Sequence, residues 1–485
     1  MHRKTKIVAT IGPASASPEV FSKMLHAGLD VARLNFSHGT ADDHRRNTDM
    51  IREVSASAGR EVAIMADLQG PKIRVGKFAE GRVTLNPGDH FILCAYPVVG
   101  GSERVSLDYP ELVNEVASGD VLVLNDGAIV LDVQSVVGKE IHTRVRIGGE
   151  LSNNKGINRQ GGGLSAPALT PKDISDLEVA IELGADLIAV SFPKSASDME
   201  QARSLVHKLC RGSAASPKLI AKIERAEAIP ALQEIIEASD GIMVARGDLG
   251  VEVGIAAVPA LQKMMIRMAR ASNRLTITAT QMMESMITHS IPTRAEVSDV
   301  ANAVLDGTDA VMLSAESATG RYPVQTIESM ANVCEEAIKL RISLPDTDLL
   351  MRDVQRLDEA TAVSAVFAAY RLSASAIIAL TESGAAPLWM SRHTSSIPIY
   401  GVTRSIATAR WMTLFQNVEP IVADSWADHD VLIAGVEDLL ISRGVVKAGD
   451  LIIVTSGKPM AAPGGTNAMK IVRVGETSPI SSYHR

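Results

Sequence analysis

The sequence predicts an α/β fold: a (β/α)8 TIM barrel with an inserted all-β lid domain and a C-terminal open α/β domain. Three observations support this prediction. Short apolar runs of strand character alternate with helical patterns to give eight β/α units. A long stretch of β-type runs and turn signals interrupts this alternation after the third strand, and a second α/β alternation follows the eighth unit. Alternating strands and helices favour a parallel sheet, and eight such units close into a barrel.

The barrel is predicted to comprise residues 1–70 and 168–343. Its eight strands are expected at residues 6–11, 31–37, 62–68, 187–192, 219–223, 242–245, 275–279 and 310–313. Helical patterns lie between them, for example at residues 18–27, 42–58, 173–183 and 257–272. Pro171 marks a helix start, because proline is tolerated in the first turn. In such a barrel the catalytic groups sit at the C-terminal ends of the strands.

The inserted domain is predicted at residues 71–167. Its β runs are expected at residues 82–85, 90–94, 121–124, 129–136 and 141–147, separated by Asn-Pro-Gly, Asn-Asp-Gly and Gly-Gly turns. Such turns suit antiparallel β structure. An insertion after the third strand lies over the active face of the barrel, where it can act as a lid.

The C-terminal domain is predicted at residues 344–485. An Ala-rich helix is expected at residues 359–372, and strands at 377–380, 399–402, 420–422 and 451–454. The loops at 381–386 and 455–465 are rich in Gly and Ser and follow strands. Loops of this kind bind phosphate readily, but an ordinary strand-to-helix turn explains each loop equally well.

Composition narrows the functional classes. The chain has 485 residues, of which 46% are apolar and 21% charged, as in a soluble globular protein. A net charge of -8 without a basic stripe argues against nucleic acid as a partner. Three widely spaced cysteines form no metal or disulfide pattern, which fits a reducing cytoplasm. The N-terminus lacks a signal-peptide pattern, and no apolar run approaches the ~18 residues of a membrane span.

Polar side chains at the strand ends form the candidate site. Asp248 follows the sixth strand in Arg-Gly-Asp-Leu-Gly, which we expect to be a tight turn with positive φ at Gly247 and Gly250. Lys222 and Glu224 share one face at the end of the fifth strand. The oxygens of Glu224 and Asp248 suit Mg²⁺ or Mn²⁺, although a single buried carboxylate is more often a salt-bridge partner.

Several cations lie near these carboxylates in the predicted fold. Lys222 beside a metal could stabilise an enolate or a transferring phosphoryl group, or could simply neutralise Glu224. Lys72 and Arg74 lie at the entry to the insertion, and Lys155 lies at its return. These cations suit a polyphosphate such as a nucleotide, whereas a solvated charge pair is the simpler interpretation of the first two.

Long motifs occur in order along nearly the whole chain: ATIGPAS (9–15), RLNFSHG (33–39), DLQGPKIR (67–74), NNKGIN (153–158), AKIER (221–225), GIMVARGDLG (241–250), ATQMMESM (279–286) and residues 292–320. Together they resemble the pyruvate kinase family. The resemblance implies transfer of the phosphoryl group of phosphoenolpyruvate to ADP, giving pyruvate and ATP in glycolysis. It also implies the same three domains, a homotetramer, Mg²⁺ (or Mn²⁺) as cofactor and regulation by a phosphorylated effector.

The resemblance also implies residue roles. Arg33 would hold the substrate phosphate, and Lys222 would stabilise the transferring group and the enolate. Glu224 and Asp248 would bind the divalent metal. The remaining assignments are as follows: Gly247 and Thr280 on the substrate carboxylate, Asn35, Phe36, Ser37, His38, Arg74 and Lys155 on the nucleotide, and Thr280 or a water near Ser314 and Glu316 as the proton donor to the enolate.

The chain departs from many family members at the monovalent-cation position. Members that require K⁺ hold it at the positions of Asn35, Ser37, Asp67 and the Leu68 carbonyl, and they carry Glu where this chain has Lys72. The ammonium of Lys72 would supply the missing positive charge. We therefore predict that K⁺ is not required.

A second departure lies in the effector loops. The first loop comprises Thr381, Glu382, Ser383, Gly384, Ala385 and Ala386, and the second contains Lys458. Members activated by fructose 1,6-bisphosphate tend to carry cationic and hydroxyl side chains there, whereas Glu382 would repel a bisphosphate. A sugar monophosphate or AMP is the expected activator.

Two other functions remain open from the residues alone. A barrel lyase or aldolase that makes a metal-bound pyruvate enolate would need Glu224, Asp248 and a cation, but no nucleotide contacts; ADP-dependent pyruvate formation separates it from a kinase. A non-catalytic metabolite-binding homologue would tolerate Lys222→Met, whereas a kinase would lose most of its turnover.

Overall fold

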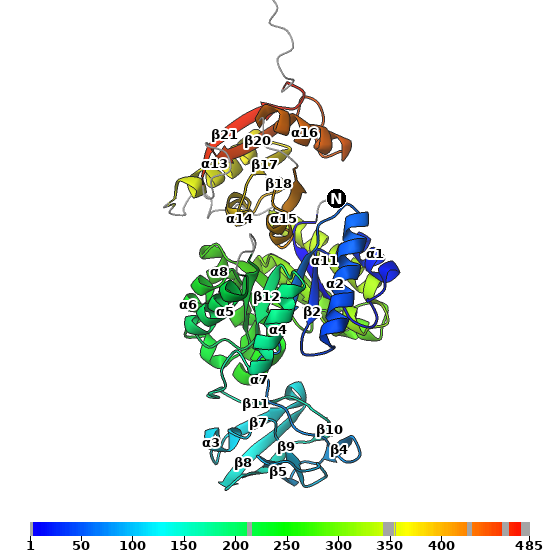
Figure 1. The fold of residues 1–485 in the computed structure, drawn as a ribbon, viewed down its shortest axis with the longest axis vertical. Coiled ribbons are helices and arrows are strands. Elements are labelled where there is room, and N and C mark those ends of the chain that lie inside the picture. The colour runs from blue at the N-terminus through cyan, green and yellow to red at the C-terminus, as the bar shows by residue number, and fades with distance from the viewer. Residues whose placement is uncertain are drawn as a thin grey trace, which may run out of the picture.

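Three domains lie one after another along the long axis of the molecule, with the barrel between the lid and the C-terminal domain (Figure 1). The structure is a computed structural model and describes residues 3–210, 216–342, 354, 356–423, 429–457 and 465–476. In these parts of the chain no single helix is long and apolar enough to cross a membrane. Only the sharply bent pair at residues 246–253 and 255–271 has the required length and composition when both helices are taken together.

The predicted barrel is confirmed: eight strands close into a sheet in the order β1-β16-β15-β14-β13-β12-β3-β2. The strands are β1 (Lys6–Thr10), β2 (Val31–Asn35), β3 (Ala63–Asp67), β12 (Leu187–Val190), β13 (Lys218–Ile223), β14 (Gly241–Ala245), β15 (Leu275–Ala279) and β16 (Ala310–Leu313). All neighbours in this sheet pair in parallel. The C-terminal strand ends therefore gather at one face, which the lid overhangs (Figure 1).

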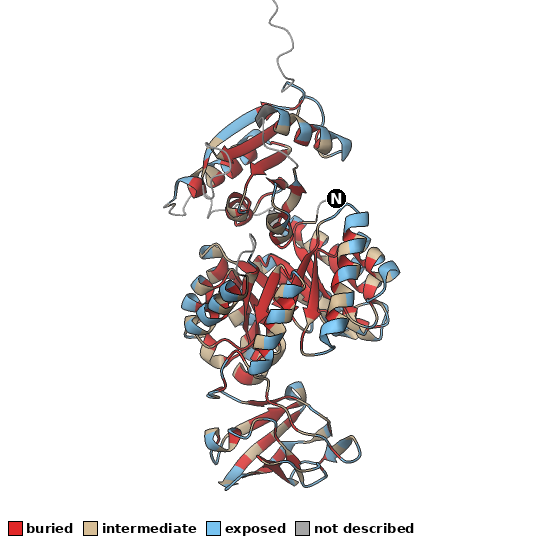
Figure 2. Cartoon of the chain, viewed as in Figure 1, coloured by how far each residue is buried: buried red, intermediate tan, exposed pale blue. Residues whose placement is uncertain are grey.

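Helices surround the barrel and bury one face each, whereas the barrel strands are buried except at Asn35 and Lys218, which are partly exposed (Figure 2). The helices are α1 (Pro18–Ala27), α2 (Ala41–Ser57), α4 (Pro171–Glu182), α5 (Ala196–Leu209), α6 (Leu232–Ala238), α7 (Arg246–Val253), α8 (Val258–Ala271), α9 (Arg294–Asp306), α10 (Ala315–Ala318) and α11 (Pro323–Ile342), with short 3-10 turns η2 (Ala226–Ala228), η3 (Ile255–Ala257) and η4 (Glu284–Ile287). Capping boxes at Thr40, Thr170 and Thr293 explain where three of them begin.

The lid has its own apolar core and two sheets. A six-stranded sheet has the order β11-β7-β8-β9-β5-β6, and β4 pairs with β10. The elements are β4 (Arg82–Leu85), β5 (His90–Cys94), β6 (Arg104–Ser106), α3 (Leu112–Glu115), β7 (Val121–Leu124), η1 (Asn125–Gly127), β8 (Ile129–Val137), β9 (Glu140–Ile147), β10 (Gly149–Ser152) and β11 (Ile157–Arg159). The five predicted strands are confirmed, and β6, β10 and β11 are additional short strands.

The C-terminal domain is an open sheet in the order β19-β18-β17-β20-β21. Its elements are α13 (Leu357–Leu372), β17 (Ala376–Leu380), α14 (Ala385–Ser391), β18 (Ile399–Thr403), α15 (Ile406–Met412), β19 (Val418–Val422), α16 (His429–Ser442), β20 (Leu451–Gly457) and β21 (Thr466–Arg473). The four predicted strands are confirmed as parallel neighbours, and β21 adds an antiparallel edge strand that the sequence pattern did not reveal.

The C-terminal domain grips the end of the barrel opposite the lid. Arg392 forms a fully buried ion pair with Asp309, the residue directly before β16; Arg392 Nη1 lies 3.0 Å from Asp309 Oδ2. Gln416 donates to the carbonyl of Thr308 at 3.0 Å, and Arg410 pairs with Glu61 at 2.9 Å. Beside these contacts lies a cleft of about 800 Å³ between the two domains.

Candidate active site

The segment after β14 is a helix, so the predicted tight turn is wrong. Helix α7 begins at Arg246, directly after the strand, and Asp248 lies in its first turn. Neither Gly247 nor Gly250 has a positive φ. Both glycines instead permit close packing: a Cβ at Gly250 would lie 3.3 Å from Val258, and one at Gly247 would lie 3.5 Å from the Thr280 hydroxyl.

A buried charge cluster joins the ends of β2, β3 and β13. Arg33 Nε lies 2.6 Å from Asp67 Oδ2, and Lys222 Nζ lies 3.1 Å from Asp67 Oδ1. Lys222 Nζ also lies 2.9 Å from Glu224 Oε1 and donates to the Ser191 hydroxyl at 2.6 Å. Register explains the gathering, because parallel strands bring their ends to one face. The sequence missed Asp67 as a partner of Lys222, and it missed Ser191 altogether.

The cluster fixes the charges of its members. Burial disfavours the Asp67 carboxylate, but the charges of Arg33 and Lys222 outweigh burial and lower the pKa of Asp67. Burial also disfavours the Lys222 ammonium, yet Asp67 and Glu224 together raise its pKa, so Lys222 remains a cation. A permanently charged ammonium in a dry site interacts strongly with a developing anion.

Glu224 and Asp248 form the carboxylate pair predicted to bind a metal. Glu224 is 2% exposed and accepts a hydrogen bond from the Phe192 backbone at 3.0 Å. Burial, and after it the charge of Asp248, raises the pKa of Glu224, although Lys222 opposes them. A divalent cation would relieve this repulsion, so the donor set fits Mg²⁺ or Mn²⁺. Within the described ranges no three His, Cys, Asp or Glu side chains form a metal-holding group. In proteins Mg²⁺ commonly takes only one or two carboxylates and keeps water and substrate oxygens as its other ligands.

Thr280 and Gly247 come together, as the resemblance implied. The Gly247 N–H donates to the Thr280 hydroxyl at 2.8 Å, and that hydroxyl donates to the Ala279 carbonyl at 2.7 Å. Thr280 has a φ of 67° and Gln281 one of 52°, the left-handed region that is unusual for a β-branched residue.

Arg246 holds this strained loop in place. Its Nη2 donates to the Thr280 carbonyl at 2.7 Å, and its Nε donates to the Ala279 carbonyl at 3.2 Å. Its Nη1 lies 2.7 Å from Asp299 Oδ1. Sequence reasoning missed this role, although Arg246 opens the Arg-Gly-Asp motif.

Ser314 and Glu316 lie at the end of β16, on the same face of the barrel. Glu316 is buried and accepts hydrogen bonds from the backbone of Ser314 at 2.7 Å and of Met283 at 3.3 Å. Its carboxylate is thus committed to holding two loops in place.

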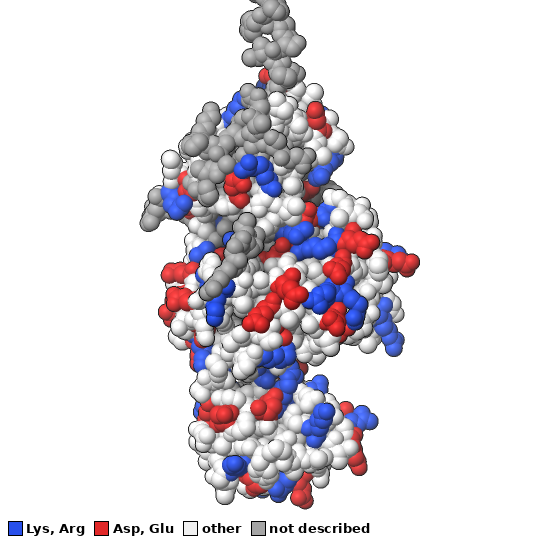
Figure 3. Space-filling view, viewed as in Figure 1, with Lys and Arg blue, Asp and Glu red and all other residues white. Residues whose placement is uncertain are grey.

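The residues predicted to contact a nucleotide lie around the junction of the barrel and the lid. Burial, followed by the charges of Arg74 and Arg33, lowers the pKa of His38. Arg74 Nη1 donates to the Asn154 carbonyl at 3.0 Å, directly before Lys155. Phe36 stacks on His44, with ring centroids 4.1 Å apart. On the face shown in Figure 3, Lys and Arg side chains gather at this junction, whereas both signs of charge are mixed over the barrel helices.

The monovalent-cation position is already supplied with positive charge. Arg33 and Lys222 both pair with Asp67. The Leu68 carbonyl accepts a hydrogen bond from Ser191 at 2.7 Å, and the Asn35 side chain accepts one from the Ser37 backbone at 3.2 Å. Lys72, which was predicted to replace the cation, forms its ion pairs with Asp248 and Asp126 and not with Asp67; its Nζ lies 2.9 Å from Asp248 Oδ1.

The first effector loop leads into α14. Thr381 accepts a hydrogen bond from the Gly384 backbone at 2.9 Å, and Ser383 accepts one from Ala385 at 3.4 Å. Glu382 pairs with Arg404, whose Nε lies 2.9 Å from its carboxylate, so part of its predicted repulsion of a phosphate is neutralised. Lys458 lies outside the described residues.

The fold and the site define a class of barrel enzyme: one with a lid, a buried cation and two carboxylates, which suits metal-assisted chemistry on an anionic substrate. Residues 2–327 match the family model "Pyruvate kinase, barrel domain", and residues 359–472 match "Pyruvate kinase, alpha/beta domain". The chain belongs to the pyruvate kinase family, and it is a phosphotransferase.

The relatives cover almost the whole chain. It is 48% identical over 478 residues to "Pyruvate kinase II" of Salmonella typhimurium, covering 97% of this chain and 99% of the relative. It is 46% identical over 461 residues to "Pyruvate kinase" of Haemophilus influenzae, covering 94% and 96%. It is 40% identical over 477 residues to "Pyruvate kinase" of Geobacillus stearothermophilus, covering 97% and 80%.

Proposed function

We propose that this chain transfers the phosphoryl group of phosphoenolpyruvate to ADP, giving pyruvate and ATP, with Lys222 stabilising the transferring charge. One observation carries the proposal: Lys222 is a buried cation that Asp67, at the end of β3, and Glu224, directly after β13, hold between them. Phosphoryl transfer spreads negative charge over equatorial oxygens, so a fixed ammonium stabilises the transition state more than the ground state.

The neighbouring residues bind the two ends of phosphoenolpyruvate. Arg33 is held rigidly by Asp67 and Thr10, at 2.6 and 2.8 Å, and binds the phosphate. The Gly247 backbone and the Thr280 hydroxyl bind the carboxylate. Glu224 and Asp248 hold Mg²⁺ or Mn²⁺, which supplies positive charge to the oxygens of the substrate when it is bound.

The enolate needs a proton after transfer. Thr280 already donates its hydroxyl proton to the Ala279 carbonyl, so it must turn before it can act as the donor. The alternative proton donor is a water near Ser314 and Glu316. The water is preferred to the Glu316 carboxylate itself, because that carboxylate already accepts hydrogen bonds from two backbone N–H groups. Asn35, Phe36, Ser37, His38, Arg74 and Lys155 contact the nucleotide.

We also propose that turnover does not require K⁺. The charges that support this proposal are those of Arg33 and Lys222 on Asp67, and that of Lys72 beside Asp248.

The domain boundaries that we propose are those predicted from the sequence, at 70/71, 167/168 and 343/344. The chain acts in the cytoplasm as a homotetramer, and a phosphorylated metabolite bound at residues 381–386 and Lys458 regulates it.

A coupled assay of pyruvate formation tests the activity. Omitting ADP should abolish pyruvate formation, because ADP is the phosphoryl acceptor. A lyase on the same barrel would still form pyruvate, since it needs no nucleotide. Lys222→Met should lower kcat by about 10³-fold, because one preorganised stabilising group contributes about 10²–10³ and the buried carboxylates lose their partner as well. ADP-independent pyruvate, or full activity in Lys222→Met, would exclude the proposed role.

A further inference from the structure

Lys72 bridges two domains through two carboxylates. Its Nζ lies 2.9 Å from Oδ1 of Asp248, in barrel helix α7, and 3.5 Å from Oδ1 of Asp126, in turn η1 of the lid. The Lys72 and Asp248 side chains are 20% and 19% exposed, and that of Asp126 is 67% exposed. Burial disfavours the ammonium, but Asp248 and then Asp126 raise the pKa of Lys72, so the bridge carries a full positive charge.

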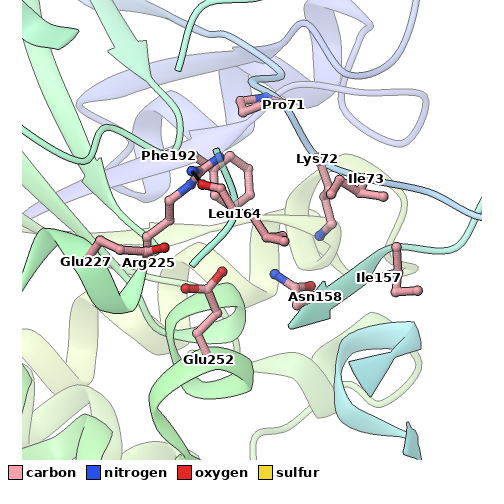
Figure 4. A pocket seen from close by; sticks show the side chains of 10 residues that line it. All are labelled: Pro71, Lys72, Ile73, Ile157, Asn158, Leu164, Phe192, Arg225, Glu227 and Glu252. Carbon is pink, nitrogen blue, oxygen red and sulfur yellow. Dashed lines mark hydrogen bonds between the residues drawn. The ribbon is translucent and has the colours of Figure 1, made fainter. Parts of the chain in front are cut away.

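The lid backbone is shaped around this bridge. Asn125 and Asp126 have φ values of 52° and 54°, in the left-handed region that Asn and Asp adopt more readily than other residues except glycine. The Asn125 N–H donates to the Gly156 carbonyl at 3.1 Å. A Cβ at Gly156 would lie 2.7 Å from Cε of Lys72, so any larger residue there would displace the lysine stem. Figure 4 shows Lys72 and Asn158 lining the same pocket.

The carboxylate that Lys72 contacts is one of the two proposed metal ligands. Asp248 cannot give the same oxygen to an ammonium and to a divalent cation, and the two cations repel each other. The field of Lys72 also reaches Glu224, the second ligand. Because of this repulsion, we expect metal entry at Asp248 to displace Lys72 and to leave it with Asp126.

We propose that Lys72 is a positioning residue that occupies Asp248 until a divalent cation replaces it, and that it thereby couples metal binding to attachment of the lid. The inference rests on the proposed function in one respect, namely that Asp248 is a metal ligand. Coupling of this kind is reciprocal: the bridge lowers the metal affinity of the substrate-free protein, and the metal loosens the lid from α7.

Binding of Mn²⁺ to the full chain without substrates tests the coupling, with free Mn²⁺ followed by electron paramagnetic resonance. Lys72→Met should tighten Mn²⁺ binding by about three- to tenfold, because it removes the competing charge at a half-buried pair. Arg74→Met is the matched control. It removes another cation from the start of the lid, one that does not contact Asp248, and it should change the affinity less than twofold.

Asp126→Asn tests whether Asp126 acts by holding the displaced Lys72 or only through the attraction of its own charge for Mn²⁺. In the parent chain it should weaken Mn²⁺ binding, since the displaced Lys72 loses its second partner. In the Lys72→Met background it should have no effect. An equal weakening in both backgrounds would mean that Asp126 acts only through its charge, and the proposed bridge would be refuted.

Hydrogen exchange gives a readout from the lid. Mn²⁺ should raise exchange in the η1 segment of the parent chain, whereas Lys72→Met should exchange fast without metal and respond little to it. Unchanged Mn²⁺ affinity in Lys72→Met, or a lid that ignores Mn²⁺ in the parent chain, overturns the inference. Asp248→Asn distinguishes the two failures: if it leaves Mn²⁺ binding intact, the proposed metal site itself is wrong, and the inference falls with it.

Discussion

Replacing Arg246 with lysine should impair catalysis far more than folding. The guanidinium reaches the carbonyls of Ala279 and Thr280 and the Asp299 carboxylate from three different nitrogens. A lysine ammonium is a single point charge and cannot reach all three groups with this geometry. The variant therefore keeps the charge while it releases the loop that holds Thr280.

The energies involved predict a small loss of stability and a large loss of turnover. Each of the two hydrogen bonds from the charged guanidinium to a backbone carbonyl contributes roughly 1.5–3 kcal/mol, so losing both destabilises the native loop conformation by about 3–6 kcal/mol. Left-handed backbone at Thr280 and Gln281 costs roughly 1–2 kcal/mol per residue, and relaxation returns that energy. The net loss of stability should be only about 1–2 kcal/mol. A shift of about 1 Å at a group that binds substrate can cost about 10²-fold in rate, so we expect a fall of that size in kcat.

Steady-state pyruvate formation and urea unfolding measure the two effects separately. Arg203→Lys is the control, because Arg203 likewise binds a backbone carbonyl (Ala238) and a carboxylate (Asp240), here through two nitrogens, but lies on helix α5. The control should lose a similar amount of stability and keep its turnover. If Arg246→Lys keeps kcat within about threefold of the parent chain, the loop does not depend on the arginine fork and the reasoning is refuted.

Three further outcomes are expected. Turnover in buffer free of Na⁺ and K⁺ should match that with K⁺ added; a large stimulation by K⁺ would contradict the proposal. Burial, with Glu227 adding to it, raises the pKa of Glu252 from 4.5 to about 7. The folded state therefore keeps a proton that the unfolded chain loses, so the free energy of unfolding should fall as pH rises from about 4.5 to 7, by on the order of 3 kcal/mol. Urea titrations at several pH values should show this fall in the parent chain and not in Glu252→Gln. Fructose 1,6-bisphosphate should lower the half-saturating phosphoenolpyruvate concentration less than a sugar monophosphate or AMP does; a dose series in which only the bisphosphate acts would reverse the assignment.

Strand and helix positions were predictable where local pattern and tertiary packing agree. Apolar runs that are buried on both faces, such as β14 and β15, were predicted to within one residue. Strands β6, β10 and β11 have three or four residues each, and each contains a single apolar residue, so no apolar run marks them. They exist because neighbouring strands supply their hydrogen bonds.

The site was predictable in its composition but not in its pairings. Strand register placed Lys222 and Glu224 at one face, and this needs only the two-residue period of a strand. The contact of Lys72 with Asp248 depends on the path of the lid, which no local pattern encodes. The error at α7 has a similar cause: glycines can signal a turn, but Gly250 is small because Val258 packs against it.

The buried pair between Arg392 and Asp309 has a consequence for communication through the barrel. Asp309 stands at the entry of β16, and Ser314 stands at its exit, five residues further on. At about 3.3 Å per residue, that is a span of roughly 17 Å, across a strand whose residues are all buried. Strand β16 is thus a direct, fully buried connection between the contact with the C-terminal domain and the barrel face that carries Ser314.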